Sequence, residues 1–221
     1  MARRRPPPSR ATSGEASRAA SGVFSRLALA ATAVFGLLTG GCASLPPEVP
    51  RTGAFDAKRL SGGWHVLATN FPMWLTGEKT EPVFLYRLTS APGETATLDD
   101  TVAYNESGRR GTIEGTDTQD PNMPTHFTWR GNGLLALFTS DWAIVATGPD
   151  DRWMVLYFTK TIATPEGVDV IARSPSLSPE DRAAVERLLA RDPFLLEKSR
   201  GIVWLDETGK GKPASQAAAV R

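Results

Sequence analysis

Side chains able to support acid–base or metal chemistry are few in this chain. Its 221 residues include two histidines, His65 and His126, and neither has a second His or a Cys at a metal-ligand spacing. Both lie in runs typical of strands, which predicts that they face solvent. No Gly-x-Ser-x-Gly elbow, phosphate-binding loop or dinucleotide fingerprint is present. We therefore expect no catalytic residue, no metal site and no cofactor.

Pairs of adjacent carboxylates are the remaining candidates for acid–base chemistry. Adjacent strand residues point to opposite faces, so Asp99-Asp100 is not expected to act as a pair. This pair and Asp150-Asp151 are better explained as turn and rim polarity, and Glu180-Asp181 as the acidic start of a helix. An enzyme acting on an isoprenoid or another lipid remains an alternative, which turnover dependent on Asp99, Asp100 or His126 would support.

Cys42 is the only cysteine, so the chain can form no internal disulfide. The preceding residues, 1–41, contain six arginines and an apolar run at 27–38 that is too short to span a bilayer comfortably, a pattern typical of a secretion signal. Leu38-Thr39-Gly40-Gly41-Cys42 resembles a bacterial lipoprotein box. The resemblance implies cleavage before Cys42 and a diacylglycerol on its thiol. Ala43, in place of Asp, implies sorting to the outer membrane.

The charge and composition of the mature chain limit its partners. Loss of residues 1–41 removes six arginines and one glutamate, which changes the formal net charge from +1 to −4. A mildly acidic surface is a poor match for polyanions, so we expect no nucleic-acid partner. The chain is 41% hydrophobic, enough for one domain, expected at 55–206. A Pro-rich tether at 42–54 is expected to be extended and to lift the domain off the membrane, and a tail at 207–221 to be disordered.

Short strands separated by turns account for most of the domain. Runs rich in Val, Ile, Thr and aromatic residues alternate with turn sequences such as Ala91-Pro92-Gly93-Glu94 and Asn105-Glu106-Ser107-Gly108. Regular antiparallel strands at this spacing favour a sandwich or an up-and-down barrel, and eight strands suffice for a closed barrel that holds one small ligand. The spacing alone does not choose between the two. The expected strands are 65–69, 82–89, 95–104, 109–118, 125–130, 142–147, 153–160 and 168–173.

One helix is expected after these strands. Ser178-Pro179-Glu180-Asp181 provides an N-cap, a proline at the first helical position and two acidic residues near the helix N-terminus. Apolar residues at 184, 185, 188 and 189 then fall at helical spacing and form one stripe, which we expect to pack against the strands. Asp192-Pro193 is expected to end the helix, and 202–205 to form a short final strand.

Two motifs at the ends of the strand region carry a family resemblance. Gly62-Gly63-Trp64 opens the first strand, and Arg173-Ser174-Pro175 ends the eighth. With the capped helix and the last strand, they make 55–205 resemble the bacterial outer-membrane lipoprotein lipocalins. This resemblance implies an all-β fold, an eight-stranded antiparallel up-and-down barrel with one C-terminal helix and a short ninth strand. It also implies that Gly62 and Trp64 start the signature, and that Arg173 stacks on Trp64 across the closed end.

The same resemblance implies a lipophilic ligand, such as a fatty acid or a lysophospholipid, inside a barrel anchored to the outer membrane and facing the periplasm. Burial of an acyl chain would contribute roughly 25 cal/mol per Å² of apolar surface. Strand register cannot be fixed from sequence, and a slip of one residue turns every side chain to the other face. The candidate lining residues are the large aromatic residues of the expected strands that could share the inward face: Phe84, Tyr86, Tyr104, Phe127, Trp129, Trp142 and Tyr157.

The sequence leaves alternatives open. A structural envelope lipoprotein, with its barrel filled by its own side chains, would share all these patterns. Arg87 and Lys160 could meet a carboxylate or phosphate head group, although solvated surface positions suit both residues better. A homodimer is equally compatible with the sequence.

Overall fold

The computed structural model describes residues 44–50 and 53–205 of the chain. The expected signal at 1–41, the lipidation site Cys42 and the expected tail at 207–221 lie outside these ranges. Among the described residues, no helix is long and apolar enough to cross a membrane.

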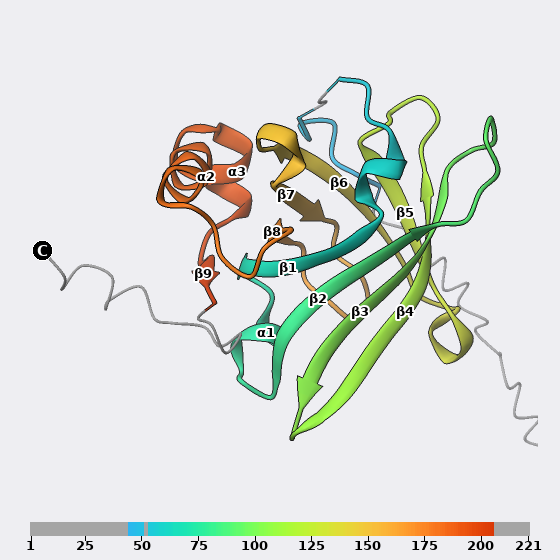
Figure 1. Cartoon of the computed structure of the whole chain (residues 1–221), viewed down its shortest axis with the longest axis horizontal. Coiled ribbons are helices and arrows are strands. Elements are labelled where there is room, and N and C mark those ends of the chain that lie inside the picture. The colour runs from blue at the N-terminus through green and yellow to red at the C-terminus, as the bar shows by residue number, and fades with distance from the viewer. Residues whose placement is uncertain (1–43, 51–52, 206–221) are drawn as a thin grey trace, which may run out of the picture. The chain divides into compact units, whose positions relative to one another are not determined.

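Eight antiparallel strands close into a barrel (Figure 1). Each strand from β1 to β7 pairs with the next one along the chain, and β8 pairs with β1, which closes the ring. The predicted fold, an eight-stranded up-and-down barrel with a C-terminal helix and a short ninth strand, is confirmed. The strands are β1 (Gly62–Thr69), β2 (Lys79–Leu88), β3 (Thr97–Glu106), β4 (Arg109–Gln119), β5 (His126–Gly131), β6 (Thr139–Thr147), β7 (Trp153–Phe158), β8 (Gly167–Ala172) and β9 (Val203–Trp204).

Strand β1 changes partner along its length. Residues 62–65 pair with β2, whereas Ala68 and Thr69 pair with β9. The pairing of β1 with β8 shifts register between Val66 and Ala68, and a bulge of this kind bends a strand. The ninth strand therefore occupies the part of the β1 edge that β2 has left.

At β6, β7 and β8 the barrel wall is apolar on both faces, because both faces are covered there. Met154 and Leu156 of β7 point into the barrel, while Val155 and Tyr157 point outward, as the two-residue period of a strand requires. The inward side chains form one cluster rich in aromatic rings. The outward side chains of β6, β7 and β8 form a second cluster under the C-terminal helices.

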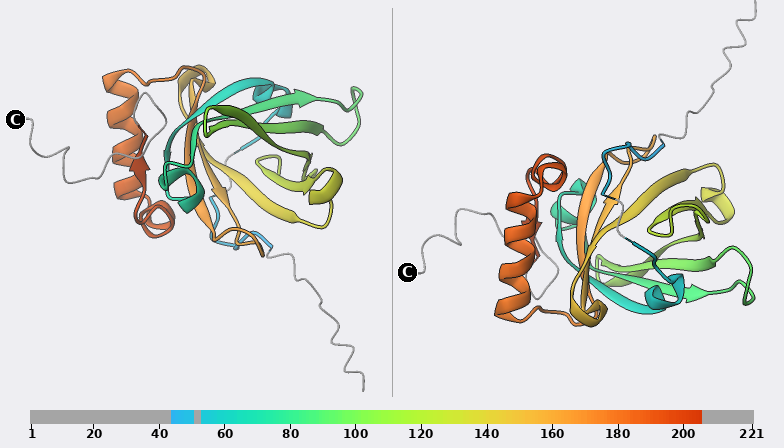
Figure 2. Two further views of the ribbon diagram at one scale, coloured as in Figure 1. Left: turned by 90° about the horizontal axis from the view of Figure 1, so that it is seen from below. Right: turned by 90° about the horizontal axis from the view of Figure 1, so that it is seen from above.

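Helix α2 (Pro179–Arg191) lies alongside the barrel, against the outer cluster (Figure 2). It begins as the sequence predicts, because the Ser178 side chain accepts a hydrogen bond from the backbone N–H of Asp181. As predicted, this helix ends at Asp192-Pro193, since its last residue is Arg191 and Asp192 is its C-cap. A second helix after it was not predicted. The Asp192 side chain accepts from the backbone N–H of Leu195 and starts a further helix, α3 (Pro193–Lys198).

Short helices precede β1 and occupy three of the connections between strands. The turn before β1 is η1 (Ala57–Leu60). Three further single turns were not predicted, because turns this short have too few residues for a periodic apolar pattern. They are α1 (Pro72–Leu75), η2 (Gly133–Leu135) and η3 (Pro149–Asp151).

The described part of the Pro-rich tether packs against the barrel. Val49 is 2% exposed and belongs to the outer cluster, against which Leu45 also packs. The backbone N–H of Val49 donates to the carbonyl of Pro46 at 3.1 Å, which forms a turn. The prediction of an extended spacer is therefore wrong for residues 45–49, because their apolar side chains find an apolar surface. His126, predicted to face solvent, is buried beside this segment.

Candidate ligand-binding site

Trp64 and Arg173 close one end of the barrel. The guanidinium carbon of Arg173 lies 3.7 Å from the centroid of the buried Trp64 ring. Arg173 also donates hydrogen bonds to the carbonyls of Ser61, at 3.0 Å, and Arg59. The indole N–H of Trp64 donates to the carbonyl of Leu60 at 2.7 Å. The structure thus brings together the two residues on which the family resemblance depends, and joins them to the segment before β1.

Gly62 permits this close approach. Its φ angle is +107°, a region that side chains other than glycine rarely adopt, and a Cβ there would lie 3.0 Å from Nη1 of Arg173. A second contact at the same end joins Arg59 to Asp151 in an ion pair. Asp151 was expected only to add polarity to a turn. Through this ion pair it links η3 to η1.

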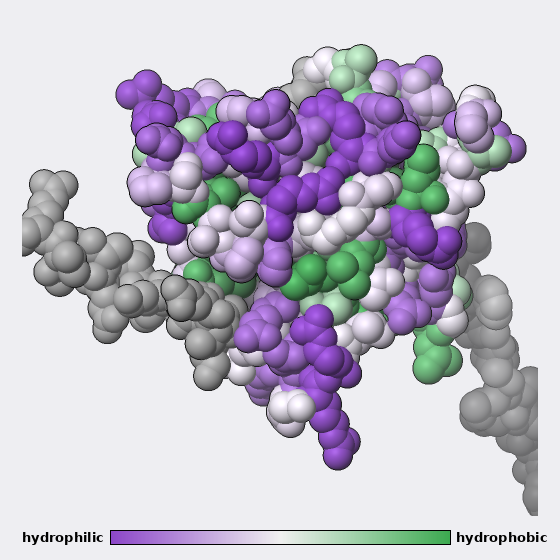
Figure 3. Space-filling model, viewed as in Figure 1, coloured by the Kyte–Doolittle hydropathy of each residue, from purple (hydrophilic) through white to green (hydrophobic). Residues whose placement is uncertain are grey.

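The opposite end of the barrel forms the mouth. Helix α1, the β3–β4 turn and the loops at 132–138 and 159–166 gather there because the strands alternate in direction (Figure 1). Three apolar side chains of the two loops, Leu134, Leu137 and Ile162, are almost fully exposed. Figure 3 shows the apolar tip of the β5–β6 loop projecting from a mostly polar surface.

A cavity of about 150 Å³ lies inside the barrel and reaches the mouth. Helix α1 contributes Met73 and Trp74 to its lining, and the β7–β8 loop contributes Thr164. The rest of the lining comes from the strands and from the residue before α1. These residues are Phe71, Phe84, Asp100, Val102, Ile113, Trp129, Ser140, Trp142, Phe158 and Asp169.

Trp142 is at the centre of the aromatic cluster inside the barrel. Its ring lies 4.4 Å from that of Phe127, centroid to centroid, with the planes 13° apart. The rings of Phe158 and Tyr86 lie 5.9 and 6.1 Å from it. Stacked, buried rings give the cavity a rigid, flat wall.

Six of the seven aromatic residues predicted to line the ligand site point into the barrel. Three aromatic lining residues were not predicted: Phe158, at the end of β7, and Phe71 and Trp74, which lie just before and within the unpredicted helix α1. Of the six, Phe84, Trp129 and Trp142 line the cavity, while Tyr86, Tyr104 and Phe127 belong to the inner cluster around it.

The seventh, Tyr157, lies on the outer face. Its ring is 5.0 Å from that of Phe194 in α3, and its hydroxyl donates to Glu166 at 2.7 Å. The interpretation of Tyr157 as a lining residue is therefore wrong, because the register of β7 places Phe158, not Tyr157, on the inner face. Nor do the two basic candidates line the cavity: Arg87 pairs with Asp99 on the surface, and Lys160 is exposed.

Acidic side chains are the unexpected feature of the interior. Asp100 of β3 and Asp169 of β8 line the cavity and are 6% and 1% exposed. Asp117 of β4 is fully buried and accepts a hydrogen bond from the indole N–H of Trp142 at 2.7 Å. One oxygen of each carboxyl group, Oδ1 of Asp100 and Asp169 and Oδ2 of Asp117, has no hydrogen-bond partner among the described residues. The interpretation of Asp100 as rim polarity is thus wrong.

The register of the strands explains the surroundings of these carboxyl groups. Asp100 is opposite Gly115 across the β3–β4 pair. Gly115 makes room for the indole of Trp129, since a Cβ there would lie 2.2 Å from its Nε1, and the indole N–H partly offsets the raised pKa of Asp100. Asp169 is opposite Thr69 of β1, whose hydroxyl has the same effect on its pKa.

Burial raises the pKa of all three carboxyl groups. It raises the pKa of Asp117 and of Asp169 to about 7. The pKa of Asp100 is raised well above its ordinary value by burial and by the negative charge of Asp117. Burial and the charges of all three groups raise the pKa of the Tyr86 hydroxyl in turn. No Lys, Arg or His is among the described residues that line the cavity.

The sequence contained a signal for two of these residues. Asp100 alternates in step with Leu98 and Val102, which places it on the same face as apolar residues. Asp169 interrupts the apolar strand between Val168 and Val170. Asp117 lies in a polar strand, where nothing distinguishes it from its exposed neighbours.

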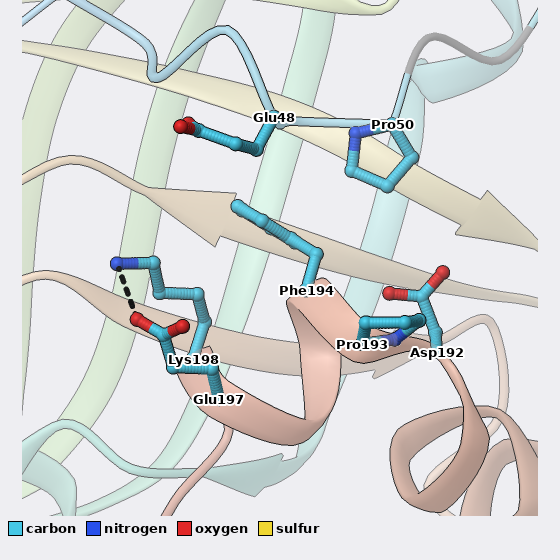
Figure 4. A pocket seen from close by; sticks show the side chains of 7 residues that line it. All are labelled: Glu48, Pro50, Asp192, Pro193, Phe194, Glu197 and Lys198. Atoms are coloured by element: carbon cyan, nitrogen blue, oxygen red, sulfur yellow. Dashed lines mark ion pairs between the residues drawn. The ribbon is translucent and has the colours of Figure 1, made fainter.

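Other parts of the described chain are weaker candidates for a binding site. It contains no group of three or more His, Cys, Asp or Glu residues that could hold a metal ion. A hollow of about 520 Å³ lies between the tether and α3, outside the barrel (Figure 4). Phe194 is its only aromatic side chain, and the remaining lining consists of prolines and charged residues, among them Lys198 paired with Glu197. This surface lacks the apolar walls that a lipophilic ligand needs.

Comparison with solved structures supports the fold. Insecticyanin from the tobacco hornworm Manduca sexta matches with a TM-score of 0.54 at 15% identity, over 73% of this chain and 86% of that chain. Lobster apocrustacyanin A1 matches at 0.47 and 16% identity, over 67% of this chain and 78% of that one. Apocrustacyanin C2 matches at 0.48 and 15%, over 71% and 79%. No family model and no curated protein matches the sequence. The fold is thus lipocalin-like, and identities this low establish no function.

Proposed function

We propose that this protein binds a small lipophilic ligand inside its barrel. The observation that carries the proposal is the cavity itself, which has aromatic walls formed by Phe84, Trp129 and Trp142 and lies between a sealed end and a mouth. A concave, mostly apolar space with a few polar groups is the usual form of a small-molecule site. A barrel filled by its own side chains, the structural alternative, would leave no such space.

The size of the cavity limits what it can enclose. A dry cavity of this volume, about 150 Å³, accommodates a body the size of one aromatic ring. The chain of a fatty acid such as palmitate, or of a lysophospholipid, is longer and would extend past Met73 and Trp74 into the mouth. The exposed Leu134, Leu137 and Ile162 would cover part of such a chain.

We further propose that the protein is attached to the outer membrane through Cys42 and faces the periplasm. The signal pattern of residues 1–41 and the single cysteine support this placement. Cys42→Ser should move the protein from the membrane fraction to the soluble fraction without changing its unfolding temperature. If the variant stays on the membrane, the anchor lies elsewhere.

Ligand binding is tested by filling the cavity. Val102 of β3 lines it, and Val102→Phe should reduce displacement of a fluorescent fatty acid and the yield of co-purified ligand in mass spectrometry. The neighbouring Thr101 points to the other face, so Thr101→Phe is the matched control and should bind normally. Equal binding by both variants would refute an interior site. No ligand and no displacement in the wild-type protein would favour the structural alternative.

A further inference from the structure

The interior of the barrel is arranged to accept hydrogen bonds. Asp100 and Asp169 line the cavity, are more than nine-tenths buried, and each has an oxygen without a partner in the described chain. A buried acceptor left without a donor costs free energy, which the fold offsets elsewhere. A ligand that brings donors to these oxygens recovers that cost.

The charge of the lining restricts the ligand further. No Lys, Arg or His is among the described lining residues, so a ligand carboxylate or phosphate would meet carboxyl groups of like charge there and no cation to pair with it. The faces of Trp129, Trp142 and Phe158 also line the cavity, and aromatic faces attract cations. The carboxyl groups and the aromatic ring faces of the lining therefore both favour a cationic ligand.

We propose that the ligand is a small lipophilic amine, whose ammonium group binds a carboxyl group of the lining, Asp100 or Asp169, and whose apolar body packs on Trp129 and Trp142. This inference rests on the proposed function. It assigns the interior of the barrel to a cationic group in place of a fatty acid head group. An ammonium supplies three N–H donors and the positive charge that the lining lacks. A neutral alcohol has one donor and no charge, so it is the natural comparison.

Binding should depend on pH because the carboxyl groups must be ionised. Burial raises the pKa of Asp169 to about 7 and that of Asp100 well above its ordinary value, so the empty site holds protons at neutral pH. An ammonium favours the ionised carboxylates and expels those protons. Affinity should therefore rise with pH through the range near 7, with proton release on binding.

Other groups near the site do not reverse this expectation. Tyr86 of β2 and Asp117 of β4 are the further titratable groups coupled to these carboxyl groups, and the pKa of Tyr86 is raised out of the range used. Thr69, Ser140 and Thr164 are neutral. At the mouth, Lys79 lies over the Tyr104 ring and pairs with Glu106, which balances its charge.

The test compares three probes of one shape by isothermal titration calorimetry on the purified protein: benzylamine, benzyl alcohol and benzoate. Charge-assisted hydrogen bonds predict that benzylamine binds about 10- to 100-fold more tightly than benzyl alcohol near pH 8, with benzoate weakest. The advantage should shrink toward about pH 5.5, as the carboxyl groups take up protons. Titrations in buffers of different ionisation enthalpy should show proton release for benzylamine alone.

Isosteric variants assign the effect to the carboxyl groups. Asp100→Asn, Asp169→Asn or both should remove most of the preference for benzylamine, and neither should change the binding of benzyl alcohol. Asp99→Asn is the matched control, because Asp99 lies next in sequence on β3 and pairs with Arg87 on the surface. It should keep the full preference.

The outcomes separate this inference from the proposed function. If benzyl alcohol or a fluorescent fatty acid binds as well as benzylamine, or if both interior variants keep the preference, the amine proposal is wrong while a lipophilic site remains. If no probe and no fatty acid binds, both proposals fall together.

Discussion

Acidic side chains on the two sides of the barrel wall have opposite surroundings. On the outer side, Asp181 of α2 accepts two hydrogen bonds from Arg152, each of 3.1 Å, and one from the indole of Trp153 at 3.2 Å. Arg152 holds the pKa of Asp181 below its ordinary value. On the inner side, Asp100 and Asp169 have no cation among the described residues that line the cavity, and their pKa is raised. The outer carboxyl group is therefore paired with a cation, whereas the inner ones are not.

The outer and inner clusters also differ in how tightly they are packed. The outer cluster consists largely of Val, Ala and Leu side chains held between the strands and α2. Small and branched side chains interdigitate well between a sheet and a helix. The inner cluster contains large planar rings, and these leave about 150 Å³ unfilled. The two clusters therefore differ in the shape of their side chains and in how completely they fill space, although both are hydrophobic.

Removal of Trp64 should have the largest effect. Trp64→Ala leaves a cavity at the closed end and removes the stacking partner of Arg173, so the free energy of unfolding should fall by about 3–5 kcal/mol in urea titrations. Trp204 provides the outer counterpart, since its ring lies 3.3 Å from the guanidinium carbon of Arg182. Trp204 is only half-buried, and Trp204→Ala should cost about 1–2 kcal/mol. Equal losses of unfolding free energy in the two variants would show that the closed end contributes no more to stability than the outer Trp204–Arg182 contact does.

The outer cluster should affect stability without affecting binding. Leu195 of α3 is fully buried there, so Leu195→Ala should lower the free energy of unfolding by about 2–4 kcal/mol. Its exposed neighbour is the control, and Leu196→Ala should change stability by less than about 0.5 kcal/mol. Both variants should bind ligand with unchanged affinity at a temperature where they are folded. A loss of affinity in Leu195→Ala would contradict the division of roles between the faces.

The pH dependence of stability should have opposite signs for the two faces. A folded-state pKa raised to about 7, as for Asp169, gives stability that is complete below the unfolded value near 3.8 and is lost as pH rises through 7. The slope is at most about 1.4 kcal/mol per pH unit for each carboxyl group. Asp181, with a lowered pKa, contributes stability that is lost only on acidification below its ordinary range.

Asp169→Asn isolates the inner contribution. In the ligand-free protein, this variant should flatten the loss of stability between about pH 4 and pH 7 and leave stability below about pH 4 unchanged, as measured by chemical denaturation across pH. Asp181→Asn should change the acid limb below about pH 4 instead. An unchanged slope between pH 4 and pH 7 in Asp169→Asn would mean that this carboxyl group does not titrate near neutrality.

The smallest effect is expected at Tyr157. Tyr157→Phe removes the hydrogen bond to Glu166 on the outer face and should cost about 0.5–1.5 kcal/mol. Ligand affinity should not change. The inner comparison is Trp129→Phe, which keeps an aromatic wall but removes the indole N–H near Asp100, and should therefore change affinity more than stability.

The strand region and its closed end were largely predictable from the sequence. Turn residues and alternating apolar runs depend on local chemistry, and the Gly62–Trp64 motif with Arg173 marks both ends of the region. The start of α2 was also predictable, because Ser178 caps it through a local hydrogen bond. The additional helix α3 was missed since Pro193 stops one helix and equally well starts another.

The chemistry of the interior was harder to predict because it depends on register. Six aromatic residues were placed on the correct face, but Tyr157 was not, since its neighbour Phe158 has the same pattern of apolar surroundings. The acidic character of the cavity arises only when β3 and β8 are brought to one space by closure of the ring. No local pattern in the sequence reports that juxtaposition.

A barrel sealed by the Trp64–Arg173 stack leaves the mouth as the route by which a ligand of the proposed kind would enter and leave. Helix α1 lies at this mouth, where its Met73 and Trp74 line the cavity. A substitution in α1 that eases passage and spares these two side chains would speed association and dissociation by the same factor, so that residence time would shorten while the equilibrium constant holds. The mouth would then set the rate of ligand exchange, and the walls would set the affinity.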